Sequence, residues 1–152
     1  MRDFIDCAFE VKAINDDGTF EGYGSVFGVV DSYNEIVAPG AFTDSLDAMK
    51  GAGRMPALLW QHRSGEPIGV YTAMREDSVG LHVSGKLALK TTRGAEAYEL
   101  LRMKALTGLS IGFVTREDSF DKVSGIRTLK KVDLWEVSLV TFPANDAARV
   151  SA

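Results

Sequence analysis

The chain has 152 residues, a formal net charge of −4, 45% hydrophobic residues and 25% charged residues, which is the composition of a folded globular domain. It contains no apolar run near the roughly 20 residues that a membrane helix needs, and no basic cluster longer than Lys130-Lys131, which disfavours membrane and nucleic-acid partners. Acidic residues where a signal peptide is apolar, and a single cysteine, Cys7, favour a reducing compartment. A chain of this length usually forms one domain, which we expect over residues 1–152.

Most of the sequence alternates apolar and polar residues with the period of two that is typical of β-strands. The first expected strand covers residues 4–14 and places Cys7 on its buried face. The run Asn15-Asp16-Asp17-Gly18 predicts a turn into a returning strand over 19–30. Glycines interrupt the returning strand at Gly22, Gly24 and Gly28, which predicts bulges or a sharp bend.

Two segments have helical spacing instead, residues 43–50 and residues 92–106. The first has Thr43 or Asp44 as its cap, and the second follows Thr91-Thr92 and ends before Gly108. The pattern therefore predicts an α+β fold with a mostly antiparallel β-barrel or sandwich. The remaining strands are expected over 56–62, 68–74, 79–89, 109–119 and 126–142.

The segment Gly108-Leu109-Ser110-Ile111-Gly112 places a hydroxyl between two glycines on one face of an expected strand. Because side chains alternate between the faces of a strand, Gly108, Ser110 and Gly112 share a face and the other face belongs to the core. We expect the gap left by the two glycines to admit an extended peptide that binds beside an exposed strand edge. A bulged strand with a purely structural role explains the same pattern.

Only two histidines occur, His62 and His82. His62 ends an apolar run and precedes the loop-like residues 63–67, so that we expect it at a strand end, held in place and reachable. Its ordinary pKa near 6.5 suits proton transfer at neutral pH. A half-exposed histidine without a role in chemistry is the alternative, and alternation places His82 on a surface face.

Glu136 lies in a segment, 133–142, that is largely apolar on both faces and is therefore expected to be a central strand. A buried carboxylate without a partner is costly. A histidine and a basic side chain are equally good candidates for that partner. Ser138 is a rival nucleophile to Ser110, although no glycines flank it.

Other chemistries have little support in the sequence. Two scattered histidines and one cysteine do not make a metal site, and no phosphate-binding glycine loop occurs, so we expect neither a metal nor a cofactor. Residues 108–112 match the letters G-x-S-x-G. In that motif a helix follows the serine, whereas here the expected helix precedes it and a β-like segment follows.

Five segments in this order resemble the prohead (capsid maturation) proteases of tailed bacteriophages, the HK97-type family. The resemblance covers nearly the whole chain. The matching segments are FEGYGSVF (20–27), Asp31 with IVAPGAF (36–42), LLWQH (58–62), GLSIGF (108–113) and WEVSLVTFPAN (135–145).

The resemblance implies a serine endopeptidase with the fold of the herpesvirus assembly proteases, a β-barrel wrapped by helices. In the family pattern the histidine after the apolar strand is the base and the serine of G-L-S-I-G-F is the nucleophile, which are His62 and Ser110 here. The herpesvirus relatives use a second histidine after the serine as the third member. This chain has no histidine after Ser110, so we place that role on Glu136, with Asp133 in reserve and a Ser-His dyad as the other alternative.

The resemblance also implies partners and a place of action. The expected substrate is the capsid scaffold or major capsid protein, and the chain itself, within the virion precursor (prohead) in the host cytoplasm. Gly108 and Gly112 are expected at the substrate-binding site, and a homodimer remains open because the herpesvirus relatives need dimers. Family members carry a C-terminal tail that we expect this chain to lack, and the small residues 150–152 suit self-cleavage. The alternative is a catalytically inactive capsid-assembly or scaffold-binding β-barrel module.

Overall fold

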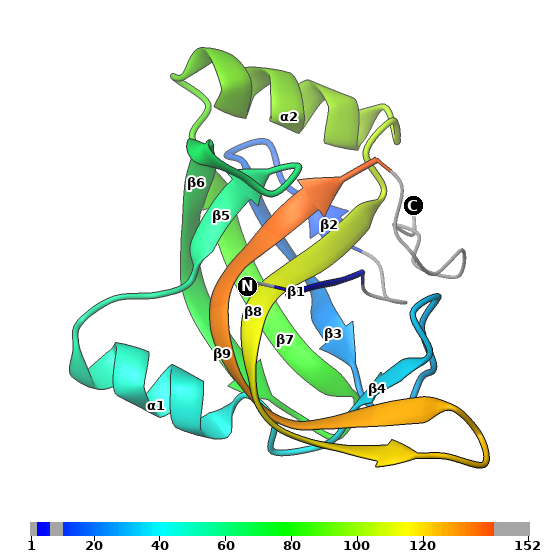
Figure 1. Cartoon of the computed structure of the whole chain (residues 1–152). Helices are drawn as coiled ribbons and strands as arrows, with labels where there is room; N and C mark the ends of the chain where they lie inside the picture. Colours follow the sequence, from blue (N-terminus) through cyan, green and yellow to red (C-terminus); the bar gives the residue numbers. More distant parts are fainter. Residues whose placement is uncertain (1–2, 7–10, 142–152) are drawn as a thin grey trace.

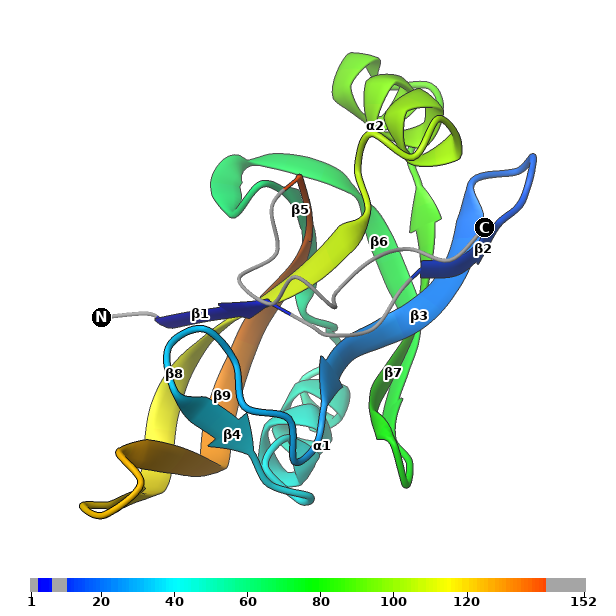
Figure 2. The same ribbon diagram turned by 90° about the vertical axis from the view of Figure 1, so that its right-hand side faces the viewer.

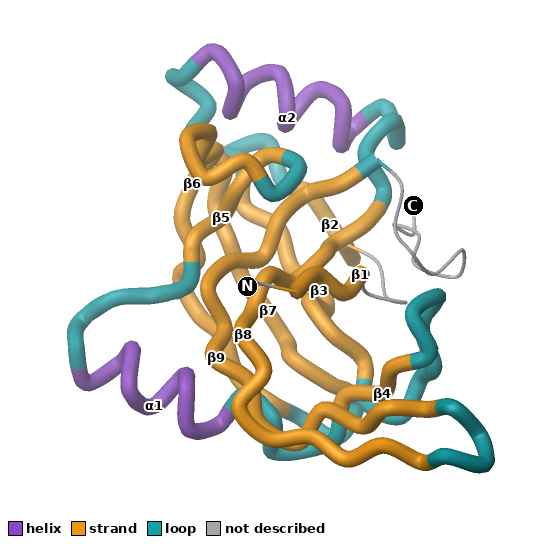
Figure 3. Tube along the Cα trace, in the orientation of Figure 1, coloured by secondary structure: helices purple, strands orange, loops and turns teal. Residues whose placement is uncertain are grey.

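The strands form one curled sheet that builds a half-barrel, with few helices. The computed structural model describes residues 3–6 and 11–141. Its elements are β1 (Asp3–Asp6), β2 (Val11–Ile14), β3 (Thr19–Val26), β4 (Glu35–Val37), α1 (Thr43–Gly51), β5 (Ala57–Trp60), β6 (Arg63–Glu76), β7 (Gly80–Leu87), α2 (Thr92–Arg102), β8 (Gly108–Asp121) and β9 (Ile126–Val140). The two helices lie outside the curl, at opposite ends of the sheet (Figures 1 and 3).

The sheet runs in the order β1-β8-β9-β5-β6-β7-β3-β2, and β4 pairs with β9 beside this path. Most neighbours are antiparallel, but β9 has two parallel partners, β4 and β5. The expected mostly antiparallel barrel is therefore matched only in part, and the fold is an α+β half-barrel. Figure 2 shows β1 on one side of the sheet, against β8, and β2 on the other side, against β3.

Alternate residues of the central strands fill the inside of the curl. Leu109, Ile111 and Phe113 of β8 are 0% exposed, as are Val137 and Leu139 of β9. Because a slip of one residue would turn every side chain of a strand to the other face, this packing fixes the register of both strands. The residues that alternate with these along each strand lie on the other face of the sheet, and they include those for which the sequence predicted a chemical role.

The N-terminal hairpin matches its predicted turn. The backbone N–H of Gly18 donates to the carbonyl of Asn15 at 2.9 Å, and Gly18 takes a φ of +86°, which is open to glycine at no steric cost. The single strand expected over residues 4–14 is instead two short strands, β1 and β2, which lie at opposite ends of the sheet order. Cys7 lies outside the described residues.

Three further strand segments differ from the sequence prediction. Residues 63–67 are not a loop but the beginning of β6, because the chain reverses within residues 61–62 and pairs at once with β5. The strand expected to reach Val30 ends at Val26, and Gly28 then takes a φ of +75°. The short strand β4 was not expected, since three residues are too few for alternation to indicate a strand.

Helix α2 begins as predicted and ends early. The hydroxyl of Thr91 accepts from the backbone N–H of Gly94 at 3.0 Å, which caps the first turn. The helix stops at Arg102 and not near Gly108, because Lys104 takes a left-handed φ of +64° and the chain closes a Schellman-type end. Within the described residues no helix is long and apolar enough to span a membrane.

Helix α1 is capped by a residue from another element. The carboxylate of Glu76, at the end of β6, accepts from the backbone N–H groups of Gly40 at 2.6 Å and Phe42 at 2.9 Å. The expected capping by Thr43 or Asp44 is wrong, because no side chain of the helix itself caps it. Glu76 thereby ties α1 to the sheet.

We predict that Glu76→Ala lowers the free energy of unfolding by about 1 kcal/mol, because two backbone donors lose a charged acceptor. Urea unfolding followed by circular dichroism measures this change. Glu117→Ala removes an exposed carboxylate of β8 and is the control with the same change in charge. Equal stability of the two variants would contradict the capping role of Glu76.

Candidate active site

His62 lies on a two-residue turn that joins β5 to β6. Trp60 pairs with Arg63 across the turn, and Gln61 and His62 have φ angles of +50° and +62°. Positive φ at both central residues is the geometry of a type I′ turn, which Asn-Gly usually occupies. For other residues such angles cost on the order of 1–3 kcal/mol each, so the surrounding structure must hold the turn in place.

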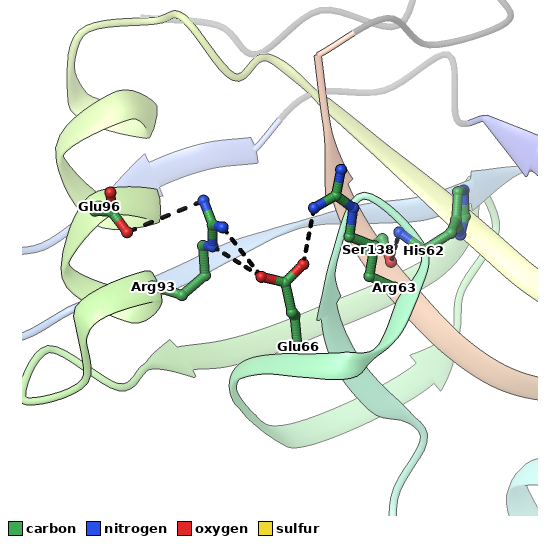
Figure 4. Close-up of polar contacts among 6 residues, drawn as sticks. All are labelled: His62, Arg63, Glu66, Arg93, Glu96 and Ser138. Carbon is green, nitrogen blue, oxygen red and sulfur yellow. Dashed lines mark hydrogen bonds and ion pairs between the residues drawn. The ribbon is translucent and has the colours of Figure 1, made fainter.

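Hydrogen bonds from both turn residues hold the turn to the end of β9. The backbone N–H of Gln61 donates to the carbonyl of Leu139 at 3.1 Å. The Gln61 amide donates to Thr141 Oγ1 at 2.6 Å and accepts from the Thr141 backbone N–H at 3.2 Å. The backbone N–H of His62 donates to Ser138 Oγ at 3.0 Å, as Figure 4 shows. These bonds offset the strain and fix the position of the imidazole.

The imidazole of His62 lies between Ser110 and Glu136. Its Nε2 is 2.6 Å from Ser110 Oγ, and its Nδ1 is 2.6 Å from Glu136 Oε2. The strand order β8-β9-β5 explains the meeting, because the three side chains come from neighbouring strands and the turn that follows β5. Ser110 is 0% and Glu136 1% exposed, whereas 19% of the His62 side chain reaches solvent.

Both carboxylate oxygens of Glu136 have hydrogen-bond partners. Oε2 accepts from His62, and Oε1 accepts from the hydroxyl of Ser138 at 2.9 Å. An ionised carboxylate only accepts, so Nδ1 of His62 carries the proton and Nε2 is oriented to accept the proton of Ser110. The partner predicted for Glu136 is therefore a histidine and not a basic side chain, and its two bonds offset the cost of burial.

Tyr71 lies behind the carboxylate. Its hydroxyl is buried and donates to the carbonyl of Val137 at 2.9 Å, between the site residues Glu136 and Ser138 of β9. Burial, with the neighbouring charge of Glu136, raises the pKa of Tyr71 well above its ordinary value. Tyr71 therefore remains a neutral donor that fixes this part of β9.

Two other residues considered from sequence lie elsewhere. Asp133, the reserve third member, forms an ion pair with Arg116 of β8, whose Nε lies 2.5 Å from Asp133 Oδ2. His82 is not on an open surface face, because only 13% of its side chain is exposed and its ring packs edge-on against Tyr23 at 5.4 Å between centroids.

Gly112 makes room for the carboxylate of Glu136. The two residues are opposite in the β8–β9 ladder, and a Cβ placed on Gly112 lies 2.8 Å from both Cδ and Oε2 of Glu136. The gap predicted beside Gly112 is thus filled. Alternation showed which face the glycine shares, but it did not show which neighbour occupies the space.

The open strand edge expected beside Ser110 is also absent. β1 pairs with β8 there, with Asp6 opposite Ser110 and Phe4 opposite Gly112. Gly108 pairs with Val140 at the start of the ladder. Roles for Gly108 and Gly112 in substrate binding remain predictions, without the support of an open edge.

Ser138 and Gln61 belong to the site, and the sequence assigned neither of them this place. A signal existed for Ser138, because alternation put it on the same face as Glu136, although it was interpreted as a rival nucleophile. For Gln61 no signal existed, since the sequence does not mark it for a left-handed conformation. Clusters of His, Cys, Asp or Glu that could hold a metal ion do not occur among the described residues.

An ion-pair network lies beside the turn (Figure 4). The two oxygens of Glu66 meet Arg63 at 3.1 Å and Arg93 of α2 at 3.0 Å, and the Arg93 guanidinium lies 4.8 Å above the ring of Trp60. The hydrogen bond from Arg63, with help from Arg93, lowers the pKa of the Glu66 carboxyl. Because exposed ion pairs contribute little each, the network mainly orients α2 against the beginning of β6.

A serine, a histidine and a carboxylate joined by hydrogen bonds are the arrangement that the class of serine hydrolases shares, on several unrelated folds. The comparison with known proteins narrows the class. The sequence profile of the Caudovirus prohead serine proteases (Peptidase_S78) matches residues 7–152, and the chain belongs to this family.

Individual relatives agree with the family. The chain is 34% identical over 147 residues to the prohead protease of Enterobacteria phage HK97, which covers 94% of this chain and 64% of that protein. It is 25% identical over 115 residues to the prohead protease of Escherichia phage T5, covering 76% of this chain and 53% of that protein. The chain thus spans less than two thirds of the length of these relatives.

A solved structure has the same fold. The capsid assembly protease of bacteriophage T4 superimposes with a TM-score of 0.74 at 10% sequence identity, over 94% of this chain and 98% of that one. At so low an identity the similarity concerns the fold alone.

We predict that Gly112→Ala displaces the carboxylate of Glu136 from His62, because the added Cβ occupies its space. A short, charge-assisted hydrogen bond at Nδ1 gives a far-downfield proton resonance in NMR spectra, which we expect to disappear in this variant while the fold persists. Gly65→Ala is the matched control, since nothing lies within 4 Å of a Cβ at Gly65. A folded Gly112→Ala protein that keeps the resonance would show that the carboxylate of Glu136 does not need the space beside Gly112 to bind His62.

Proposed function

We propose that this chain is a serine endopeptidase that cleaves the capsid scaffold or major capsid protein, and itself, during prohead maturation in the host cell. The observation that carries the proposal is the His62 imidazole, 2.6 Å from both Ser110 Oγ and Glu136 Oε2. The names of the relatives, prohead proteases and a capsid assembly protease, support the substrate class.

In the proposed first half of the reaction, Ser110 Oγ attacks a peptide carbonyl carbon while His62 Nε2 takes the hydroxyl proton. The tetrahedral intermediate collapses when the carbon–nitrogen bond breaks and His62 returns that proton to the leaving amine. Ser110 then holds the new carboxyl end of the substrate as an ester. Glu136 keeps Nδ1–H oriented and stabilises the imidazolium that forms in between.

The second half repeats these roles with water. His62 takes a proton from a water molecule as its oxygen attacks the ester carbon, and then gives the proton to Ser110 Oγ as the ester bond breaks. Because both steps use the same imidazole, the position of its ring controls both rates.

The proposed reaction also requires that the substrate peptide reaches the hydroxyl of Ser110. Ser110 is fully buried, whereas part of the His62 side chain is exposed. Cleavage therefore requires a local opening on the exposed side of His62 that brings a peptide to Oγ. The same burial favours the second candidate function, a catalytically inactive capsid-assembly or scaffold-binding module.

We further infer a single protease domain over residues 1–152 with the fold of the herpesvirus assembly proteases. The half-barrel with helices outside its curl, and a serine and a histidine on the outer face of the sheet, support this inference. For the herpesvirus protease fold we expect a mostly antiparallel barrel. The sheet of this chain departs from that expectation at β9, which has two parallel neighbours.

We predict that immature capsids containing scaffold protein are processed by the unmodified chain and not by Ser110→Ala, because the ester cannot form. Loss of a catalytic nucleophile typically lowers the rate by about 10⁴-fold or more. Intact-mass analysis of the capsid proteins measures the cleavage. Ser119→Ala changes an exposed serine of the same strand and should cleave normally. Cleavage by a folded Ser110→Ala protein would rule out Ser110 as the nucleophile, and absence of cleavage by the unmodified chain would favour the inactive-module alternative.

We predict that Glu136→Gln lowers the cleavage rate about 10²- to 10⁴-fold, because glutamine stabilises neither the required tautomer nor the imidazolium. Asp133→Asn removes the same charge from the pair with Arg116 and is expected to stay within about twofold of the unmodified rate. A small effect of Glu136→Gln would indicate a Ser-His dyad, and a large effect of Asp133→Asn would restore Asp133 as the third member.

A further inference from the structure

The hydroxyl of Ser138 connects the backbone of His62 to the carboxylate of Glu136, which the imidazole of His62 also contacts directly. Its Oγ accepts from the backbone N–H of His62 at 3.0 Å and donates to Glu136 Oε1 at 2.9 Å. The imidazole of His62 closes the circuit through Nδ1 and Glu136 Oε2 at 2.6 Å. His62 is thus bound to the same carboxylate twice, once directly and once through Ser138.

This circuit fixes two degrees of freedom that the reaction depends on. The His62 backbone has a strained φ of +62°, and the bond to Ser138 holds its N–H in that conformation. The Glu136 carboxylate can rotate about its last bond, and the bond from Ser138 to Oε1 leaves Oε2 directed at Nδ1. Without the hydroxyl, the part-buried N–H of His62 and a buried carboxylate oxygen of Glu136 each lose a partner, which costs more than a typical hydrogen bond.

The place of Ser138 in the sheet makes it a rigid support. It lies on the central strand β9, opposite Ser110 of β8 and beside Leu59 of β5, and it is 0% exposed. Its proton is donated to Glu136, while Nε2 of His62 is directed at Ser110. The geometry therefore separates the two serines, and Ser110 alone is placed to transfer its proton to the imidazole.

We propose that Ser138 is a positioning residue for the proposed protease reaction, which holds the His62 backbone and the Glu136 carboxylate in the relative position that directs Nε2 at Ser110. The inference rests on the proposed function. It assigns Ser138 an effect on the rate of proton transfer from Ser110 and none on the binding of a reagent that modifies Ser110.

The test is the kinetics of Ser110 modification by an alkyl fluorophosphonate, which separates the maximal rate constant kinact from the binding constant KI. In Ser138→Ala we expect kinact to fall roughly 10- to 100-fold, the effect of a small misplacement of a reacting group, with KI unchanged. The downfield Nδ1–H resonance of His62 should shift or broaden in the same variant. Ser138→Cys keeps the volume with only weak hydrogen bonding and repeats the test if the alanine variant does not fold.

The matched control is Ser45→Ala. Ser45 is also buried, and its hydroxyl also accepts from a backbone N–H, that of Leu134 on β9, at 2.9 Å. A comparable loss of stability with unchanged kinact and an unchanged His62 resonance is expected. Unchanged kinact and resonance in folded Ser138→Ala or Ser138→Cys would overturn the positioning role while leaving the proposed function intact. Absence of Ser110 modification in the unmodified chain would instead overturn the proposed function, and the role of Ser138 with it.

Discussion

The bond between the buried carboxylate of Glu136 and the imidazole of His62 is the interaction on which the site depends. Glu136 is 1% exposed in the middle of the sheet, where an ionised group without partners would strongly destabilise the fold. His62 and Ser138 satisfy its two oxygens, and Gly112 leaves the space that the carboxylate fills. The same contacts that make the burial tolerable orient the histidine toward Ser110.

The half-barrel supplies this arrangement through its apolar side. The inward residues of β8 and β9 around the site are fully buried, so the outward residues between them have a fixed direction and register. Parallel pairing of β5 with β9 then delivers the turn that carries His62 to the same outward face. The backbone strain of this arrangement is concentrated in two residues with left-handed φ angles, Gln61 and His62. Hydrogen bonds to the end of β9 hold both of them in that conformation.

The local parts of this account could be predicted from the sequence. Alternation gave the faces of residues 108–113 and 136–139, the central place of Glu136 and its need for a partner, and the turn signal gave the first hairpin. Alternation failed at residues 134–135, where a bulge puts Leu134 in the core and leaves Trp135 57% exposed. The parallel neighbours of β9, the space at Gly112 and the reversal at residues 61–62 could not be predicted, because each depends on contacts between distant segments. Gln61 shows this best, since only its bonds to Thr141 and Leu139 explain a conformation that its side chain disfavours.

The central claim is that one hydroxyl, that of Ser110, is activated by His62. Peptide mapping by mass spectrometry after treatment with a fluorophosphonate locates the modified residue directly. The account predicts an adduct on Ser110 that is lost in a folded His62→Ala protein. An adduct on Ser138, or labelling of Ser110 that persists without His62, would contradict it.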